Sequence, residues 1–174
     1  MKDVFLCFSK ENSLYARIIR YLINGSVNHV FFIFWSEDWH DYLSMETDWR
    51  GTVLVPAKDL VQSMYKVRYF QCLNKDLVEG LLANFDLVGK KYAWSSIFGF
   101  LLKIIYQNTF KRIIPNPIRS KNRVFCSELA VDVLKKSGVG FSKNLDPEST
   151  SPEDLLDLIK KDIGWVEETC TFLR

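Results

Sequence analysis

The chain has 174 residues and a net charge of +2, with 48% apolar and 25% charged residues. These values favour a single soluble globular domain over residues 1–174, and the small charge gives no reason to expect nucleic-acid binding. The most apolar stretch, Trp94 to Tyr106, is far shorter than a bilayer span, and the N-terminus lacks the apolar run of a secretory signal. The sequence therefore predicts a cytoplasmic protein.

The N-terminal half is dominated by short β-branched and aromatic runs. In chain order, its predicted elements are a strand over 3–8, a helix from Asn12 or Ser13 to Ile23, and strands over 30–35, 41–46, 52–55 and 66–73. None of the connections is long enough for a crossover helix, which favours an antiparallel meander. Alternation in the last strand places Tyr69 and Phe70 on opposite faces, and Gly51 is free to take a positive φ in the turn over 47–51.

The C-terminal half is mostly helical in its pattern. Its predicted elements are helices over 74–87, 93–106 and 126–137, a basic, proline-bearing loop over 109–123, and a helix that begins at Ser151-Pro152. The predicted fold class is α+β: a small antiparallel sheet, or partial barrel, that packs on a helical half.

The four cysteines are scattered without a CxxC pair, which argues against a zinc site and fits a reduced protein. Cys7, Cys72 and Cys170 lie in strand-like runs, whereas Cys126 begins a helix. The macrodipole and free N–H groups of a helix N-terminus favour a thiolate, and they can also stabilise the oxyanion of an acyl intermediate. Cys126 is thus the candidate nucleophile, expected in a solvent-facing groove, and no cofactor or metal is expected.

A base must come from another element, and the chain has only two histidines. His29 lies at the edge of the strongest strand, which would hold its ring rigidly for general-base catalysis. His40 lies in a charged turn and is expected to be exposed, although it stays an alternative base. Glu46 ends the next strand and is the candidate carboxylate that orients His29, but it could instead pair with Arg50 or a lysine on the surface.

Five motifs follow one another in a characteristic order. They are Asn28-His29-Val30, Glu46, Gly51-Thr52-Val53-Leu54-Val55-Pro56, Cys126-Ser127-Glu128-Leu129 and Ser151-Pro152-Glu153-Asp154-Leu155. Together with Gly89-Lys90-Lys91-Tyr92, they resemble the permuted NlpC-type papain-like hydrolases, specifically the YiiX-like group. The resemblance spans most of the chain. It implies a circularly permuted papain-like fold, a Cys-His-Glu site, and hydrolysis of amide or ester bonds in peptides or cell-wall fragments.

Two further residues are candidates for contact with the oxyanion or the substrate. Tyr92 could donate its phenol to the oxyanion, although a place in the core is the more usual role for such a tyrosine. Ser127 directly follows the candidate nucleophile. The expected partner is thus a peptide, amide or acyl substrate.

Three functions compete for this sequence. The first is a cysteine peptidase or amidase. The second is a thiol acyltransferase or lipid deacylase of the lecithin retinol acyltransferase type, with an apolar groove lined by residues such as Trp94, Phe98 and Phe100. The third is a binding module without turnover, in which Cys126 is simply a small buried residue. The basic loop before Cys126 suggests an acidic substrate or a phospholipid headgroup as a minority alternative to plain solvation, so membrane contact stays open.

Overall fold

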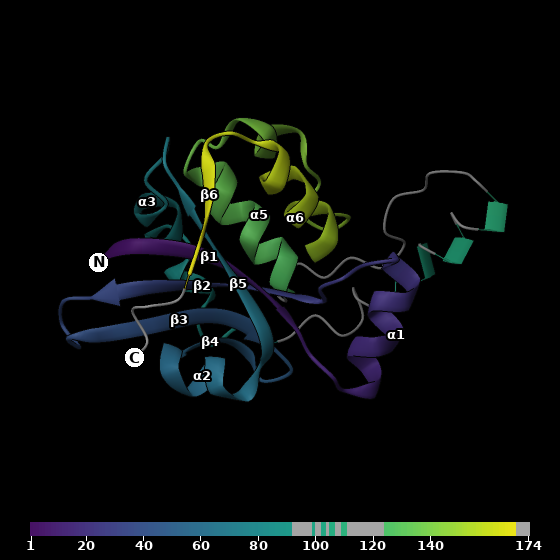
Figure 1. Ribbon diagram of the computed structural model, residues 1–174, viewed down its shortest axis with the longest axis horizontal. Coiled ribbons are helices and arrows are strands. Elements are labelled where there is room, and N and C mark those ends of the chain that lie inside the picture. Colours follow the sequence, from purple (N-terminus) through teal and green to yellow (C-terminus); the bar gives the residue numbers. More distant parts are fainter. Residues whose placement is uncertain (92–98, 100–101, 104, 107–108, 111–123, 170–174) are drawn as a thin grey trace.

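A computed structural model of the chain describes residues 1–91, 99, 102–103, 105–106, 109–110 and 124–169 (Figure 1). The strands are β1 (Lys2–Lys10), β2 (His29–Ser36), β3 (Asp41–Asp48), β4 (Gly51–Pro56), β5 (Tyr65–Cys72) and β6 (Trp165–Glu168). The α-helices are α1 (Leu14–Ile23), α2 (Ala57–Ser63), α3 (Val78–Leu82), α5 (Cys126–Lys136) and α6 (Pro152–Lys161). Two 3₁₀ turns, η1 (Phe85–Leu87) and η2 (Gly140–Asn144), complete the described elements. The predicted α+β class is therefore confirmed.

The strands form an open antiparallel sheet in the order β4-β3-β2-β1-β5-β6. The meander prediction holds for β2, β3 and β4 but is wrong for β5, which pairs with β1 instead of β4. The chain crosses the sheet through α2, a helix that the sequence analysis missed because it is only seven residues long. The short strand β6 was also missed, and it adds to the sheet beside β5.

The sheet has helices on both faces, as Figure 1 shows with α5 and α6 on one side and α2 on the other. The larger core lies under α5 and α6 and contains Phe32 and Phe70, whereas the smaller core lies under α2 and contains Phe31 and Tyr69. The predicted alternation in β5 is therefore confirmed. Because β2 is buried on both faces, it reads as a continuous apolar run instead of an alternating one.

Two helices begin as the sequence predicts. The Ser13 hydroxyl accepts a hydrogen bond from Ala16 N at 3.2 Å at the start of α1, and the helix ends at Asn24 in the left-handed conformation (φ 50°). At the start of α6, the Ser151 hydroxyl accepts from Asp154 N at 3.1 Å while the Asp154 carboxylate accepts from Ser151 N at 2.9 Å. This reciprocal pair is a capping box, and it fixes where α6 begins.

The helix predicted over 74–87 is wrong in its extent. Asp76 caps the Val78 amide at 2.8 Å, so α3 begins at Val78 and not near Asn74. The chain leaves the α-helical conformation at Asn84, whose side chain donates to Gly80 O at 2.8 Å, and continues as η1. Side chains that bond to nearby backbone groups compete with helix hydrogen bonds, and this competition explains the early end.

Several predictions fall on residues outside the described ranges. They include most of the helix over 93–106, the basic loop, the proposed groove residues Trp94, Phe98 and Phe100, and Cys170. Within the described residues, no helix combines the length and the apolar character that crossing a membrane requires.

We expect Gly80→Ala to destabilise the protein, because α3 and α5 touch at this position. A β-carbon on residue 80 would lie 2.2 Å from Ser137 Oγ and 2.3 Å from Val133 O. Relief requires the two helices to separate, at a cost of about 1–3 kcal/mol. Urea denaturation of the variant would measure the loss. Gly140→Ala is the matched control, since no atom lies within 4 Å of the added carbon, and an equal loss in both variants would contradict the packing argument.

Candidate functional site

His29 is the first residue of β2, and the residue before it anchors the start of this strand. The Asn28 side-chain oxygen accepts a hydrogen bond from Glu11 N at 2.9 Å and from Arg20 Nη1 at 2.5 Å, while Asn28 N donates to Ser9 O at 3.2 Å. Residues from β1 and α1 therefore fix the backbone beside His29. The sequence motif pointed to Asn28, but not to this anchoring role.

The His29 ring contacts the carboxylate of Glu46. Alternation places His29 on the face of β2 that carries Phe31 and Ile33, and Ile33 pairs with Ser44, whose face of β3 also carries Glu46. The His29 Nε2 atom lies 3.1 Å from Glu46 Oε2, and both side chains are buried. The His29 ring also stacks on Phe31, with centroids 5.6 Å apart. The predicted contact between His29 and Glu46 is thus present, while their catalytic role stays a prediction.

Cys126 is the first residue of α5, as the sequence predicts. The N-cap position of α5 is occupied by Phe125, whose own side chain makes no capping hydrogen bond, in contrast to Ser13 on α1 and Ser151 on α6, while the Glu128 carboxylate accepts from Phe125 N at 3.3 Å. A helix start whose N-cap residue has no capping side chain leaves its first N–H groups available to an anion. The first turn of α5 therefore suits either a thiolate or an oxyanion.

The side chains of Cys126, on α5, and of Glu46, on β3, both act on the pKa of His29, on β2. Burial acts to lower the pKa of His29, but hydrogen bonds with the Cys126 and Glu46 side chains, together with their charges, outweigh it. The pKa of His29 consequently lies well above its ordinary value of 6.5. Since Nε2 faces Glu46, Nδ1 is the ring nitrogen left for the thiol. The histidine therefore lies between a sulfur and a carboxylate.

Arg50 is a site residue that the sequence analysis placed only on the surface. Its Nη2 atom lies 2.9 Å from Glu46 Oε1 and 2.7 Å from Asp48 Oδ2, and its Nε donates to Asp48 Oδ2 at 2.8 Å. Glu46 thus contacts both His29 and Arg50, one through each carboxylate oxygen, while its orienting role stays a prediction. The signal in the sequence was the i, i+4 spacing of Glu46 and Arg50 across the turn.

The other candidate residues lie in different settings. The Ser127 hydroxyl donates to Thr150 O at 2.6 Å and is buried, so its backbone amide is the group left for a substrate. Tyr92 lies outside the described residues. His40 is exposed in the turn between β2 and β3, at the opposite end of β2 from His29, with a left-handed φ of 48°. This position excludes His40 as the partner of Cys126.

Two long-range contacts link the start of β2 to α6, and α5 to the segment that precedes α6. The Glu153 carboxylate accepts hydrogen bonds from Ser26 N at 2.7 Å and Val27 N at 3.0 Å, just before β2 begins. The bond from Ser127 to Thr150 connects α5 to the segment that precedes α6. The Ser-Pro-Glu-Asp motif therefore helps to hold the start of α5 against the start of β2.

Glu128, two residues after Cys126, has a strongly shifted carboxyl group. Burial raises the pKa of Glu128 to about 7, against the lowering effect of the hydrogen bond from Phe125 N. The negative charges of Asp132, Glu148 and Asp146 add to the rise. Near neutral pH, the first turn of α5 therefore carries a partly protonated acid close to the thiol.

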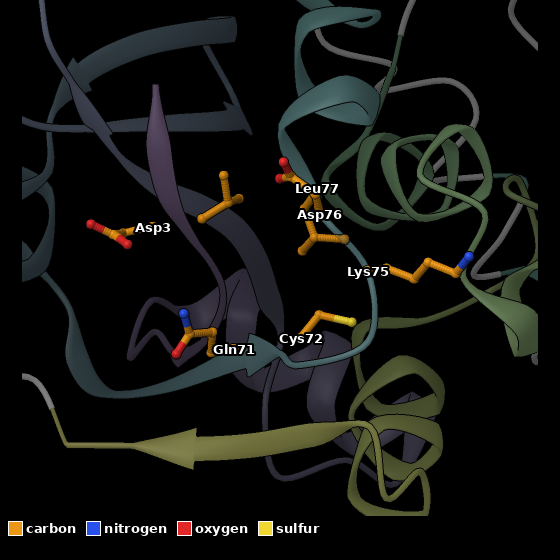
Figure 2. Close-up of a pocket in the computed structure, with 7 residues that line it drawn as sticks. Asp3, Gln71, Cys72, Lys75, Asp76 and Leu77 are labelled. Carbon is orange, nitrogen blue, oxygen red and sulfur yellow. The ribbon is translucent and has the colours of Figure 1, made fainter.

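The site is more closed than the sequence analysis expected. Cys126 is 8% exposed and His29 is 5% exposed, so the expectation that Cys126 faces solvent is wrong. A separate pocket of about 120 Å³ is lined by residues that include Asp3 and Cys72 (Figure 2). It lies at the opposite end of β1 from Ser9, the residue that pairs with His29, and so it is separate from the site.

Comparisons with known proteins support the fold. No protein-family model and no curated protein matches the chain. Among solved structures, the chain is similar to the metalloprotein yiiX from Escherichia coli O157:H7, with a TM-score of 0.54 and 15% sequence identity. The match covers 95% of this chain and 94% of that chain. At this identity the likeness concerns the fold, and in fold the protein is YiiX-like.

Proposed function

We propose that the protein is a thiol-dependent hydrolase, a cysteine peptidase or amidase that acts on peptide or cell-wall-type amide bonds. The observation that carries the proposal is the position of His29, which bonds to Glu46 through Nε2 and interacts with Cys126. A thiol, an imidazole and a carboxylate in series form the arrangement that activates a nucleophile. The permuted NlpC-type papain-like assignment belongs to this proposal, supported by the YiiX-like fold and by the order His29, Glu46, Cys126.

The proposed reaction has two steps. In the first, the Cys126 thiolate attacks the substrate carbonyl carbon, and the first N–H groups of α5 stabilise the oxyanion. The C–N bond breaks as the His29 imidazolium gives its proton to the leaving amine. In the second, His29 takes a proton from water as this water attacks the thioester. The acid product then leaves, and the thiolate and imidazolium are restored.

The similar E. coli protein is described as a metalloprotein, which raises the question of a metal at this site. Nε2 of His29 is already directed at Glu46, so the ring lies between the carboxylate and the thiol and the three groups do not converge on one point. Among the described residues, no group of three or more His, Cys, Asp or Glu side chains is arranged to hold a metal ion. The described residues therefore do not fit a metal centre, and the proposed steps use none.

We expect a small activated ester to form a covalent acyl group on Cys126. The thioester should be detectable as a mass increase of the intact protein, assigned to Cys126 by peptide mapping. Cys126→Ala should lose the acyl group and all turnover, whereas Cys72→Ala, at a cysteine on β5, should keep both. Turnover of a small amide would support a peptidase or amidase. Turnover of acyl esters or phospholipids alone would favour the lipid deacylase, and no acylation at all would leave a binding module.

A further inference from the structure

The Glu46 carboxylate is shared between two cationic partners. Its Oε2 lies 3.1 Å from His29 Nε2 and its Oε1 lies 2.9 Å from Arg50 Nη2. The Glu46 side chain is only 2% exposed, so little water competes for either oxygen. Electrostatic interactions are stronger in such a setting than in bulk solvent. Removal of the charge on one partner should therefore change how strongly Glu46 interacts with the other partner.

The geometry of the turn holds Arg50 firmly in place. Asp48 accepts from Arg50 N at 2.8 Å and from Arg50 Nε at 2.8 Å, which fixes both the backbone and the guanidinium plane. Gly51, which follows directly, has a φ of 116°, and a β-carbon there would lie 2.2 Å from Lys90 O. The loop around Lys90 is itself bonded to Thr52 on β4. A guanidinium held in this way keeps one orientation toward Glu46.

We infer that Arg50 is a positioning residue that shares the Glu46 carboxylate with His29 and so limits how tightly Glu46 holds a proton on His29. His29 faces Cys126 from α5 and Glu46 from β3, and Arg50 and Asp48 lie beyond Glu46. If Glu46 had His29 as its only cationic partner, the imidazolium would be overstabilised. It would then give up its proton reluctantly to a leaving group.

This catalytic consequence rests on the proposed hydrolase function, but the sharing of Glu46 can be measured without any turnover. The chain has only two histidines, so isotope-labelled histidine gives two NMR signals, and exposed His40 serves as an internal reference. We expect Arg50→Gln to raise the titration midpoint of His29 by about one pH unit, a tenfold change in its protonation equilibrium. Arg50→Lys keeps the positive charge but not the forked hydrogen bonds to Asp48 and Glu46, so it should raise the midpoint less than Arg50→Gln.

The controls separate sharing of the carboxylate from a purely structural role. Arg68→Gln removes an arginine of similar kind, paired with Glu167 at 2.6 Å on β5 and β6, and should leave the His29 midpoint unchanged. A fall of the midpoint in Arg50→Gln would mean that Arg50 merely keeps Glu46 in reach of His29, and an unchanged midpoint would mean no coupling. Either result overturns the inference. If the hydrolase proposal fails but the inference holds, Cys126 will be unreactive while the His29 titration midpoint is still raised in Arg50→Gln.

Discussion

Iodoacetamide at mildly acidic pH should label Cys126 before the other cysteines, and His29→Ala should slow this labelling by about tenfold or more. The thiolate is the reactive form, and in the structure only Cys126 combines a helix start with a histidine partner among the described cysteines. Cys7 is fully buried in β1, and Cys72 is the last residue of β5 and does not begin a helix. Mass spectrometry after brief alkylation would rank the four sites.

Two variants control this experiment. His40→Ala removes the other histidine, which is exposed and far along β2, and should leave the labelling rate unchanged. Cys126→Ser should fold normally, because it replaces one small side chain by another and opens no sizeable cavity. If all four cysteines are labelled at the same rate, or if His29→Ala does not change the labelling rate of Cys126, only the binding-module function remains.

Replacing Glu46 by alanine should produce the second large effect, this time on stability. The variant leaves the buried His29 without its carboxylate, and loss of one member of a buried ion pair costs about 3–5 kcal/mol. The Arg50 side chain is 42% exposed, so the loss of its pair with Glu46 adds little to this cost. Part of this loss depends on pH. Because the pKa of folded His29 is raised above 6.5, the stabilisation from its protonation is complete below pH 6.5 and fades as pH rises through the folded pKa. The deficit of Glu46→Ala should therefore be larger at pH 6 than at pH 9, as urea denaturation at the two pH values would show.

The matched control for this variant is Glu167→Ala. Glu167 also lies on a strand and pairs with an arginine, Arg68, but its side chain is 45% exposed. Exposed ion pairs contribute about 0–1 kcal/mol, so its loss should be small at both pH values. Equal costs for the two glutamates would show that Glu46 behaves as an ordinary surface residue. A Glu46→Ala deficit that grows with pH would contradict the raised pKa of His29.

The sequence predicted those site residues that lie at the start of a helix or a strand, because local patterns indicate where helices and strands begin. Cys126 follows an apolar run and precedes a helical pattern, and His29 opens the strongest strand, so local signals alone placed both side chains at element ends. The contact of Glu46 with His29 was predicted from the place of Glu46 at the end of the next strand and from the family resemblance. These are short-range patterns, which a sequence displays directly.

The remaining features depend on tertiary contacts that local patterns do not encode. Local patterns do not indicate that β5 pairs with β1, because this pairing joins residues that lie about 60 positions apart in the chain. The burial of Cys126 arises from the packing of α5 on the larger core. Glu46 bonds to both His29 and Arg50, and such a double role appears only when the coordinates of both partners are known.

The sheet order also has a consequence for how the protein is made. Strands β1 to β5 come from residues 2–72, and they can pair with one another while the chain is still being synthesised. Cys126 arrives on the ribosome only after these strands, and α5 must then dock across a long sequence separation, which is a slow type of contact to form. A nascent chain thus contains the histidine and its carboxylate well before it has a thiol beside them. The rate at which Cys126 gains its reactivity during refolding would report when the helical half docks.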